Sequence, residues 1–159
     1  MYELLNILLG AGVISVIGNA LLTSFREARE RKRERRGLLR LLLAEFRGIN
    51  RSVELILHNP EFITYSPDEA FVDEAWKQSR VRLAQLLPYS EDFDLFGAYY
   101  EDQGVAKGLS KRWAEQGWHV GFQTDNPALD DFIEQLQLLQ RYGRAAEGAI
   151  LRYGVSISF

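Results

Sequence analysis

The stretch LLRLLLAEFRGINRSVELI, residues 38–56, decides the fold that the sequence predicts. Its apolar residues recur at alternating steps of three and four, which places them along one face of a helix. These residues are Leu39, Leu42, Phe46, Ile49, Val53 and Ile56. Such a seam indicates a helix that packs against other helices. Because proline and the residue before it disfavour helix, Pro60 predicts that this helix ends near His58.

A second helix is predicted by its capping residues. The segment SPDE, residues 66–69, has Ser at the N-cap, Pro at the first helical position and Glu at the third, which completes a capping box. The helix that it begins is expected to stop before Pro88. Its apolar residues are Val72, Trp76, Leu83 and Leu86.

A third predicted helix begins at Ser90, which is followed by an acidic first turn. It runs to Trp113 or slightly beyond, and Gly104 weakens it, which leaves open whether the helix is kinked or broken there. After a long loop, Asn126 and Pro127 open a fourth helix that ends at Gly154. That helix repeats the alternating apolar step at Leu129, Phe132, Leu136, Leu139, Gly143, Ala146, Ile150 and Tyr153.

These patterns predict an all-α protein in which residues 38–159 form an antiparallel, four-helix-like bundle. The 159 residues suit one domain, and a hydrophobic content of 47% supplies a core without disulfides or metal. At the end of the chain, Val155, Ile157 and Phe159 alternate with polar residues. They indicate a short edge strand or a loose tail that packs against the first helix or touches a membrane surface.

Upstream of the seam, residues 26–40 carry eight basic side chains and three glutamates. The basic residues are Arg26, Arg29, Arg31, Lys32, Arg33, Arg35, Arg36 and Arg40. The residue types are strong helix formers and Glu27 pairs with Arg31 at i,i+4, so a continuous exposed helix is expected. A nucleic-acid arm would bring aromatic residues or a recognisable module, and neither is present. We therefore expect a juxtamembrane helix that binds anionic lipid, with a purely solvated helix as the alternative.

Residues 1–25 contain one charged side chain, Glu3, and the run from Leu4 to Phe25 has none. As a helix this run is roughly 33 Å long, which matches a hydrocarbon core of about 30 Å. The positive charge follows the run, whereas a signal peptide has it in front. The positive-inside rule then predicts a transmembrane helix with its N-terminus outside and the bulk of the chain in the cytoplasm. A buried core helix and an interfacial helix are the alternatives.

Small and polar residues line one face of this predicted span at three- and four-residue spacing. They are Ala11, Gly12, Ser15, Gly18, Asn19 and Thr23. In lipid, small residues let helices approach closely and an Asn amide needs a partner, so the face is a candidate transmembrane helix contact. The alternative is that a single span tolerates these residues without any partner.

Catalytic and metal-binding chemistry has little support. The chain has no cysteine. Glu54 with His58 and Glu115 with His119 share the i,i+4 spacing of a metal pair, but a histidine at a helix C-terminus is favoured by the helix dipole alone. The acidic pairs at 91–92, 101–102 and 130–131 are expected to be solvated faces and helix first turns. We predict no metal, no cofactor and no enzymatic activity.

Three aromatic residues lie at or after the end of the third helix: Trp113, Trp118 and Phe122. They either cap the bundle core or form a surface for a protein partner.

Charge is unevenly distributed along the chain. Residues 41–159 carry eleven basic and eighteen acidic side chains and are therefore acidic, whereas the net charge of the whole chain is −3. An acidic segment that follows a basic one fits an anchored module.

The layout resembles that of bacterial proteins with one amino-terminal span, an Arg/Glu-rich juxtamembrane helix and a small helical domain. That resemblance implies that the protein is located in a bacterial inner membrane. It does not assign a function to any residue of this chain. The first hypothesis is a membrane-anchored interaction or scaffold protein that binds a protein partner or itself. The alternative is an oligomerising membrane effector that perturbs or permeates the bilayer, and the third is an enzyme with an unrecognised carboxylate site.

Overall fold

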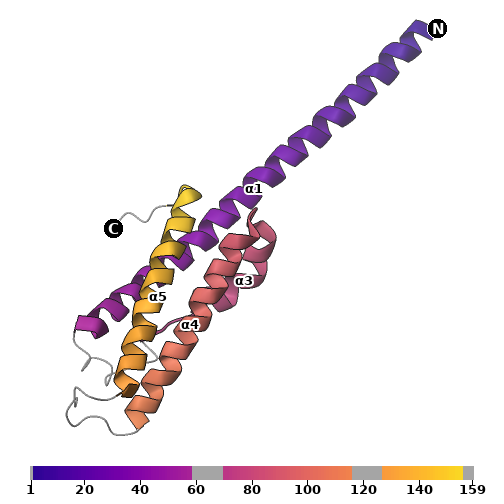
Figure 1. Cartoon of the computed structure of the whole chain (residues 1–159). Helices are drawn as coiled ribbons and strands as arrows, with labels where there is room; N and C mark the ends of the chain where they lie inside the picture. The colour runs from indigo at the N-terminus through magenta and orange to yellow at the C-terminus, as the bar shows by residue number, and fades with distance from the viewer. Residues whose placement is uncertain (1, 59–69, 116–126, 156–159) are drawn as a thin grey trace. The chain divides into compact units, whose positions relative to one another are not determined.

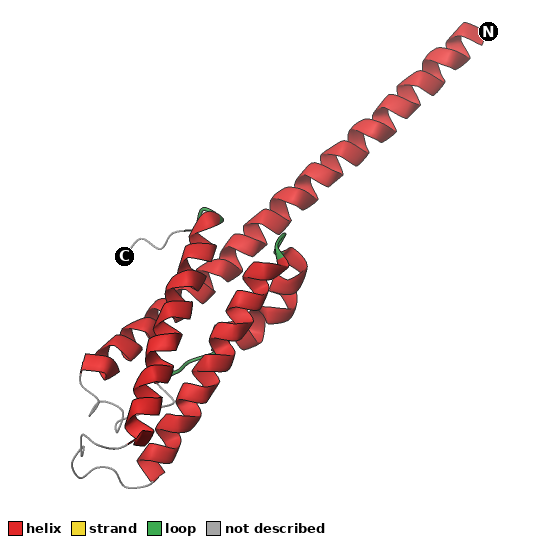
Figure 2. Cartoon of the chain, in the orientation of Figure 1, coloured by secondary structure: helices red, strands yellow, loops and turns green. Residues whose placement is uncertain are grey.

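The computed structural model describes residues 2–58, 70–115 and 127–155, and of residues 2–18, 113–115 and 127–129 it describes the backbone alone. The described helices are α1 (Tyr2–His58), α3 (Glu74–Leu86), α4 (Ser90–Glu115) and α5 (Pro127–Arg152). All regular structure in these residues is helical, which confirms the all-α prediction (Figures 1 and 2).

The chain divides into two compact units, residues 1–35 and residues 36–159. The first unit consists of the N-terminal part of α1. In the second unit, the rest of α1 packs with α3, α4 and α5 (Figure 1). Asp92 contacts Arg152 whereas Asp102 contacts Gln135, so α5 runs antiparallel to α4. Arg36 lies next to Gly154 whereas Asn50 lies next to Gly143, so α5 also runs antiparallel to α1. The predicted helical bundle is therefore confirmed.

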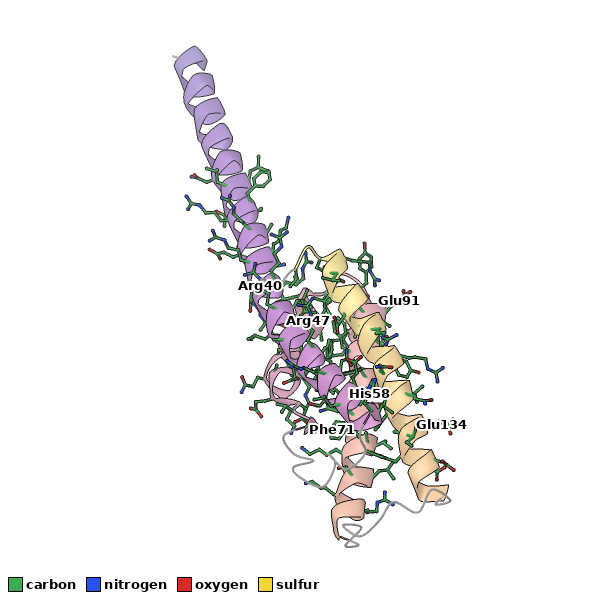
Figure 3. The ribbon with its side chains drawn as sticks, turned by 90° about the vertical axis from the view of Figure 1, so that its left-hand side faces the viewer. Arg40, Arg47, His58, Phe71, Glu91 and Glu134 are labelled. Atoms are coloured by element: carbon green, nitrogen blue, oxygen red, sulfur yellow. The ribbon has the colours of Figure 1, made fainter. Side chains whose placement is uncertain are left out.

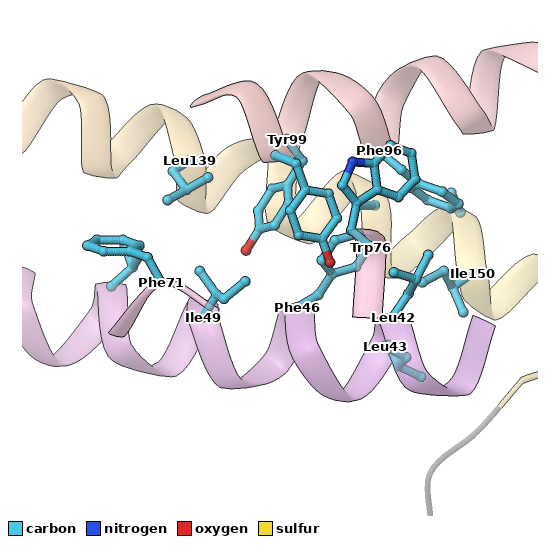
Figure 4. Packing of buried hydrophobic residues seen from close by; sticks show 14 of the residues in the cluster. Leu42, Leu43, Phe46, Ile49, Phe71, Trp76, Phe96, Tyr99, Leu139 and Ile150 are labelled. Carbon is cyan, nitrogen blue, oxygen red and sulfur yellow. The ribbon is translucent and has the colours of Figure 1, made fainter. Parts of the chain in front are cut away.

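The predicted seam of α1 forms one side of the core (Figure 4). All six of its residues are buried, and α4 and α5 supply the opposite side. Phe46 is central, because its ring lies 4.6 Å from that of Tyr99 and 5.7 Å from that of Phe96. The largest fully buried side chains are Tyr99, Phe46, Phe71, Phe96, Phe132, Leu39, Leu42, Leu43, Ile49, Leu83, Leu136 and Leu139.

Most predicted helix ends are also confirmed. The helix α1 ends at His58, and α3 ends at Leu86 because Leu87 is extended, with ψ 129°, ahead of Pro88. Gly154 ends α5 in the left-handed conformation, with φ 66°, which glycine adopts without a steric penalty. The helix α4 is not broken at Gly104, because it continues without interruption to Glu115.

The prediction for the second helix is wrong at residues 71–73. The helix α3 begins at Glu74, so Val72 lies outside it, and the expected capping box at 66–69 falls outside the described residues. Tertiary contacts explain the late start. Phe71 is fully buried, and Gln103 and Lys107 donate to the backbone carbonyls of Val72 and Phe71 at 3.0 and 3.4 Å. These contacts satisfy carbonyl groups that a helix would otherwise use.

No helix is both long enough and apolar enough to cross a membrane over the residues that the structure describes. The predicted span over residues 1–25 falls largely on residues 1–18, whose side chains lie outside the described part. In the predicted tail, Val155 is buried in the core, with 2% of its surface exposed, and Ile157 and Phe159 lie outside the described part.

Candidate partner-binding groove

The predicted basic residues lie along the exposed surface of α1. Every side chain from Asn19 to Glu34 is exposed. Arg35 is half-buried, whereas Arg36 is exposed. Arg40, which is labelled in Figure 3, is also exposed. The first unit therefore presents five exposed basic side chains of the eight, together with three large apolar ones. Leu21, Leu22 and Phe25 are 54%, 58% and 72% exposed.

Of the predicted small and polar face, the structure describes the side chains of Asn19 and Thr23. Both are exposed, and the Thr23 hydroxyl donates to the backbone carbonyl of Asn19 at 2.8 Å. The Thr23 side chain thus bonds within its own helix. Ala11, Gly12, Ser15 and Gly18 have side chains outside the described part.

The other predicted candidates do not form a site in the described residues. His58 is exposed, and its Nδ1 lies 2.8 Å from the backbone carbonyl of Glu54, four residues earlier in the same helix. The side chains of Glu115 and His119 lie outside the described part, as do those of Trp113, Trp118 and Phe122. Where side chains are described, no group of three His, Asp or Glu residues is arranged to hold a metal ion.

The structure instead brings together a groove between α3 and α4 that the sequence analysis missed. Its volume is about 570 Å³, within the range of ligand pockets, and it is open to solvent. We call it the α3–α4 groove. It is lined by Asp73, Trp76, Lys77, Arg80, Phe93, Asp94, Gly97, Ala98, Tyr100 and Glu101.

Aromatic rings form the inner surface of the α3–α4 groove. The ring of Trp76 stacks on that of Tyr100, with centroids 5.1 Å apart and an angle of 7° between the planes. The ring of Phe93 also lies against that of Trp76, with centroids 5.3 Å apart. Both Trp76 and Tyr100 are also part of the core, so the inner surface of the groove is continuous with the packing of the bundle.

Glu45 fixes this aromatic surface from α1. Its carboxylate accepts the backbone N–H of Ala75 at 2.7 Å and that of Trp76 at 3.4 Å, which caps the N-terminus of α3. The Tyr100 hydroxyl donates to the same carboxylate. Burial, and then this hydrogen bond, raise the pKa of the Tyr100 phenol far above its ordinary value. The N-cap residue of α3, Asp73, makes no capping bond of its own.

The charged residues around the α3–α4 groove are unevenly paired. Lys77 lies 2.9 Å from Asp73, and this hydrogen bond is the main cause that raises the pKa of the Lys77 ammonium. In the described part of the chain, no opposite charge lies within salt-bridge distance of Arg80, Asp94 or Glu101. The groove therefore presents one guanidinium and two carboxylates without an internal ion pair.

A second polar cluster lies between α1, α4 and α5, inside the bundle. The Asn50 amide donates to Glu147 at 2.9 Å, and the Tyr99 hydroxyl donates to Asn50 at 3.4 Å. Arg47 also reaches Glu147, at 3.5 Å. Burial, and then the charge of Glu147, raise the pKa of the Tyr99 phenol. Gly143 makes room for this cluster, since a Cβ added there would lie 2.1 Å from Asn50 Oδ1.

One residue of the predicted acidic pairs is buried. The Asp92 side chain is 6% exposed, and its two oxygens accept hydrogen bonds from Arg152, at 2.6 Å, and from the Tyr153 hydroxyl. Asp92 thus lies in the first turn of α4, as predicted, and Glu91 is exposed, but Asp92 is buried and not solvated, because its carboxylate joins the first turn of α4 to the end of α5. Asp102 is half-buried and accepts from Gln135 at 3.3 Å.

The groove had one weak signal in the sequence. Asp94, Gly97, Ala98 and Glu101 follow an i, i+3, i+4, i+7 pattern, which places them on one face of α4. That face carries no large apolar residue. The pairing of this face with Trp76 on α3 is a tertiary contact that no local spacing reveals.

Comparison of the chain with protein-family models, with curated proteins and with solved structures finds no match. The functional argument therefore depends on the residues and geometry above.

Proposed function

We propose that this protein is a single-pass, membrane-anchored interaction module of a bacterial inner membrane. In this proposal residues 1–25 span the bilayer with the N-terminus outside, residues 26–40 bind anionic lipid at its cytoplasmic surface, and residues 38–159 present a binding surface in the cytoplasm. The main support is the exposure of Leu21, Leu22 and Phe25 directly before the basic run.

Exposed large apolar side chains on an isolated helix are unfavourable in water. Covering such surface contributes about 25 cal/mol per Å², and each basic side chain near an anionic surface adds about 1 kcal/mol. A bilayer satisfies both groups at once, because it offers hydrocarbon to Phe25 and anionic headgroups to Arg26 and the basic residues after it. The uncharged run from Leu4 to Phe25 has the length for the span.

The absence of cysteine from the sequence permits a direct topology test. Single-cysteine variants Tyr2→Cys and Arg51→Cys are expressed in a Gram-negative host, and spheroplasts are treated with a membrane-impermeant maleimide. We expect Tyr2→Cys to be labelled in intact spheroplasts and Arg51→Cys to be labelled after lysis alone. Labelling of both variants in intact cells, or release of the protein by alkaline carbonate, contradicts the proposal.

A matched pair of charge variants tests the basic run. Replacing Arg26, Arg29, Arg31 and Arg33 by Gln is expected to invert or mix the topology, since this removes four of the eight basic residues on which the positive-inside rule depends. The control replaces four exposed arginines of the bundle by Gln and should keep the original orientation: Arg51, Arg112, Arg141 and Arg144. The same maleimide labelling, with Tyr2→Cys in both backgrounds, measures the orientation.

The second candidate function is an oligomerising membrane effector that perturbs or permeates the bilayer. One observation favours it, namely the exposure of the Asn19 side chain next to Thr23, whose hydroxyl is already bonded. An Asn amide in lipid favours a partner helix. The size of the detergent-extracted protein is compared with that of Ser15→Leu/Asn19→Leu, and a monomer in both cases removes this candidate.

A further inference from the structure

We propose that the α3–α4 groove binds an amphipathic helix of a partner protein whose basic side chains face Asp94 and Glu101. This inference rests on the proposed function, because it names the surface through which the anchored bundle binds and the chemistry of what it binds. It is argued from the charge, shape and apolar surface of the groove, taken in turn.

The charge of the groove favours a basic partner. Lys77 and Asp73 neutralise each other at 2.9 Å, which leaves Arg80 on the α3 side and Asp94 and Glu101 on the α4 side. Asp94 and Glu101 are both exposed, and both lack an ion pair among the described residues. Complementary charges give specificity and speed association even where they add little affinity.

The spacing of the two carboxylates fits a helix. Asp94 and Glu101 are seven residues apart on one face of α4, which separates them by roughly 10.5 Å along the helix axis. Two basic residues at i and i+7 of a partner helix have the same separation. Between the carboxylates, Gly97 and Ala98 leave the backbone nearly bare, and a Cβ added at Gly97 would meet nothing within 4 Å. A partner helix can therefore approach α4 closely at this point.

The aromatic surface supplies an apolar anchor. Trp76, Phe93 and Tyr100 line the groove beneath these charges, and Glu45 holds Tyr100 and the start of α3 in place. Trp76 and Tyr100 keep 9% and 8% of their surface exposed and Phe93 is half-buried, so these rings offer a small, fixed apolar edge to a partner side chain at little entropic cost. The expected partner helix thus carries apolar residues between its two basic ones, and an acidic residue on the side that faces Arg80.

The test uses the full chain in detergent micelles and a pair of synthetic helical peptides. One peptide is alanine-based and fluorescent, with two lysines two turns apart and leucines between them, and its twin has glutamates in place of the lysines. We expect the lysine peptide to bind at least about tenfold more tightly than its twin, by fluorescence anisotropy. Asp94→Lys/Glu101→Lys should reverse this preference.

A matched control separates the groove from overall charge. Glu54→Lys/Glu134→Lys makes the same change in net charge at exposed positions outside the groove, and it should keep the preference for the lysine peptide. Equal binding of the two peptides, no binding of either, or an unchanged preference in Asp94→Lys/Glu101→Lys overturns the proposal.

Site-specific crosslinking identifies the occupant. A photoreactive maleimide on Ala98→Cys, in the groove, should crosslink the lysine peptide, whereas the same group on Leu55→Cys, on the exposed side of α1, should not. If Ala98→Cys instead crosslinks to a second copy of the chain, and neither peptide reduces this crosslink, that copy is the occupant of the groove and the proposal is overturned. Loss of membrane anchoring would be seen separately, in the labelling of Tyr2→Cys.

Discussion

Glu45 on α1 accepts the backbone N–H of Ala75 on α3 at 2.7 Å, so a side chain of one helix caps the amino end of another. Capping residues usually precede the helix that they cap. Here the residue in that position, Asp73, is paired with Lys77 and makes no capping bond. The position of α3, and with it one wall of the α3–α4 groove, therefore depends on a carboxylate that lies thirty residues earlier in the chain.

Replacement of Glu45 tests this dependence. We expect Glu45→Ala to lower the free energy of unfolding by about 2 kcal/mol, because it removes a helix cap and leaves the buried Tyr100 hydroxyl without its acceptor. Glu45→Gln keeps one acceptor oxygen and should cost about half as much. Urea denaturation measures both values, and amide hydrogen exchange should show α3 opening before α4. Glu54→Gln, an exposed change on the same helix, is the control and should stay within about 0.5 kcal/mol of wild type.

Stability should fall in alkali because of two buried tyrosines. Burial raises the pKa of Tyr99 and Tyr100 above the ordinary value of 10.0. Below that pH both the folded and the unfolded chain keep these protons, and above it the unfolded chain releases them. The free energy of unfolding is then expected to drop by about 1.4 kcal/mol per pH unit for each tyrosine. Urea denaturation between pH 9 and pH 11, in steps of about half a unit, measures the slope.

The double variant Tyr99→Phe/Tyr100→Phe identifies the source of this slope. It should be less stable at neutral pH, since it removes the hydroxyl that donates to Glu45 and the one that donates to Asn50, but its alkaline decline should be shallower by about 2.7 kcal/mol per pH unit. Either single variant should remove about half of the difference. An unchanged slope in the double variant would assign the decline to other groups.

Local patterns were sufficient to predict the helices and the core. The step of three and four residues from Leu39 to Ile56 predicted a seam that is buried throughout. Pro60, Pro88 and Gly154 predicted helix ends because their backbone restrictions are properties of single residues. Whether Gly104 breaks its helix was left open by the sequence, and the local cost of about 1 kcal/mol does not interrupt α4.

The groove and the late start of α3 were not predictable in this way. Phe71 lies outside α3 because its side chain is fully buried. In addition, Gln103 and Lys107 donate hydrogen bonds to the backbone carbonyls of Val72 and Phe71. From its local sequence Asp92 was expected to be a solvated first-turn residue. In the folded chain, however, Arg152 of α5 donates a hydrogen bond to its carboxylate. Each of these contacts joins residues more than thirty positions apart, so no local spacing contains them.

Gly143 offers a test of close packing between α1 and α5. A Cβ at this position would lie 2.1 Å from Asn50 Oδ1 and 2.7 Å from Asn50 Nδ2. We expect Gly143→Ala to destabilise by about 1–3 kcal/mol, because it displaces Asn50 from Glu147 and Tyr99. Gly148→Ala, in the same helix with nothing within 4 Å, should instead stabilise by about 0.5–1 kcal/mol through helix propensity.

A double-mutant cycle checks the reason for the Gly143 effect. Asn50→Ala removes the side chain that clashes, so Gly143→Ala in that background should cost less than it does in wild type. The coupling is expected to reach about 1 kcal/mol or more by urea denaturation. Costs that add without coupling would show that the helix backbones, and not Asn50, resist the extra methyl group.

The pairing of Asp92 with Arg152 should be asymmetric. The Asp92 side chain is 6% exposed and that of Arg152 is 67% exposed, so the cost of losing each partner differs. Arg152→Ala leaves the buried Asp92 carboxylate with the Tyr153 hydroxyl as its remaining partner, so it should cost about 3 kcal/mol and increase hydrogen exchange at the end of α5. Asp92→Ala removes the buried charge itself and leaves Arg152 in contact with solvent, so it should cost less, about 1–2 kcal/mol. Equal costs in urea denaturation would contradict the idea that Arg152 compensates the buried charge of Asp92.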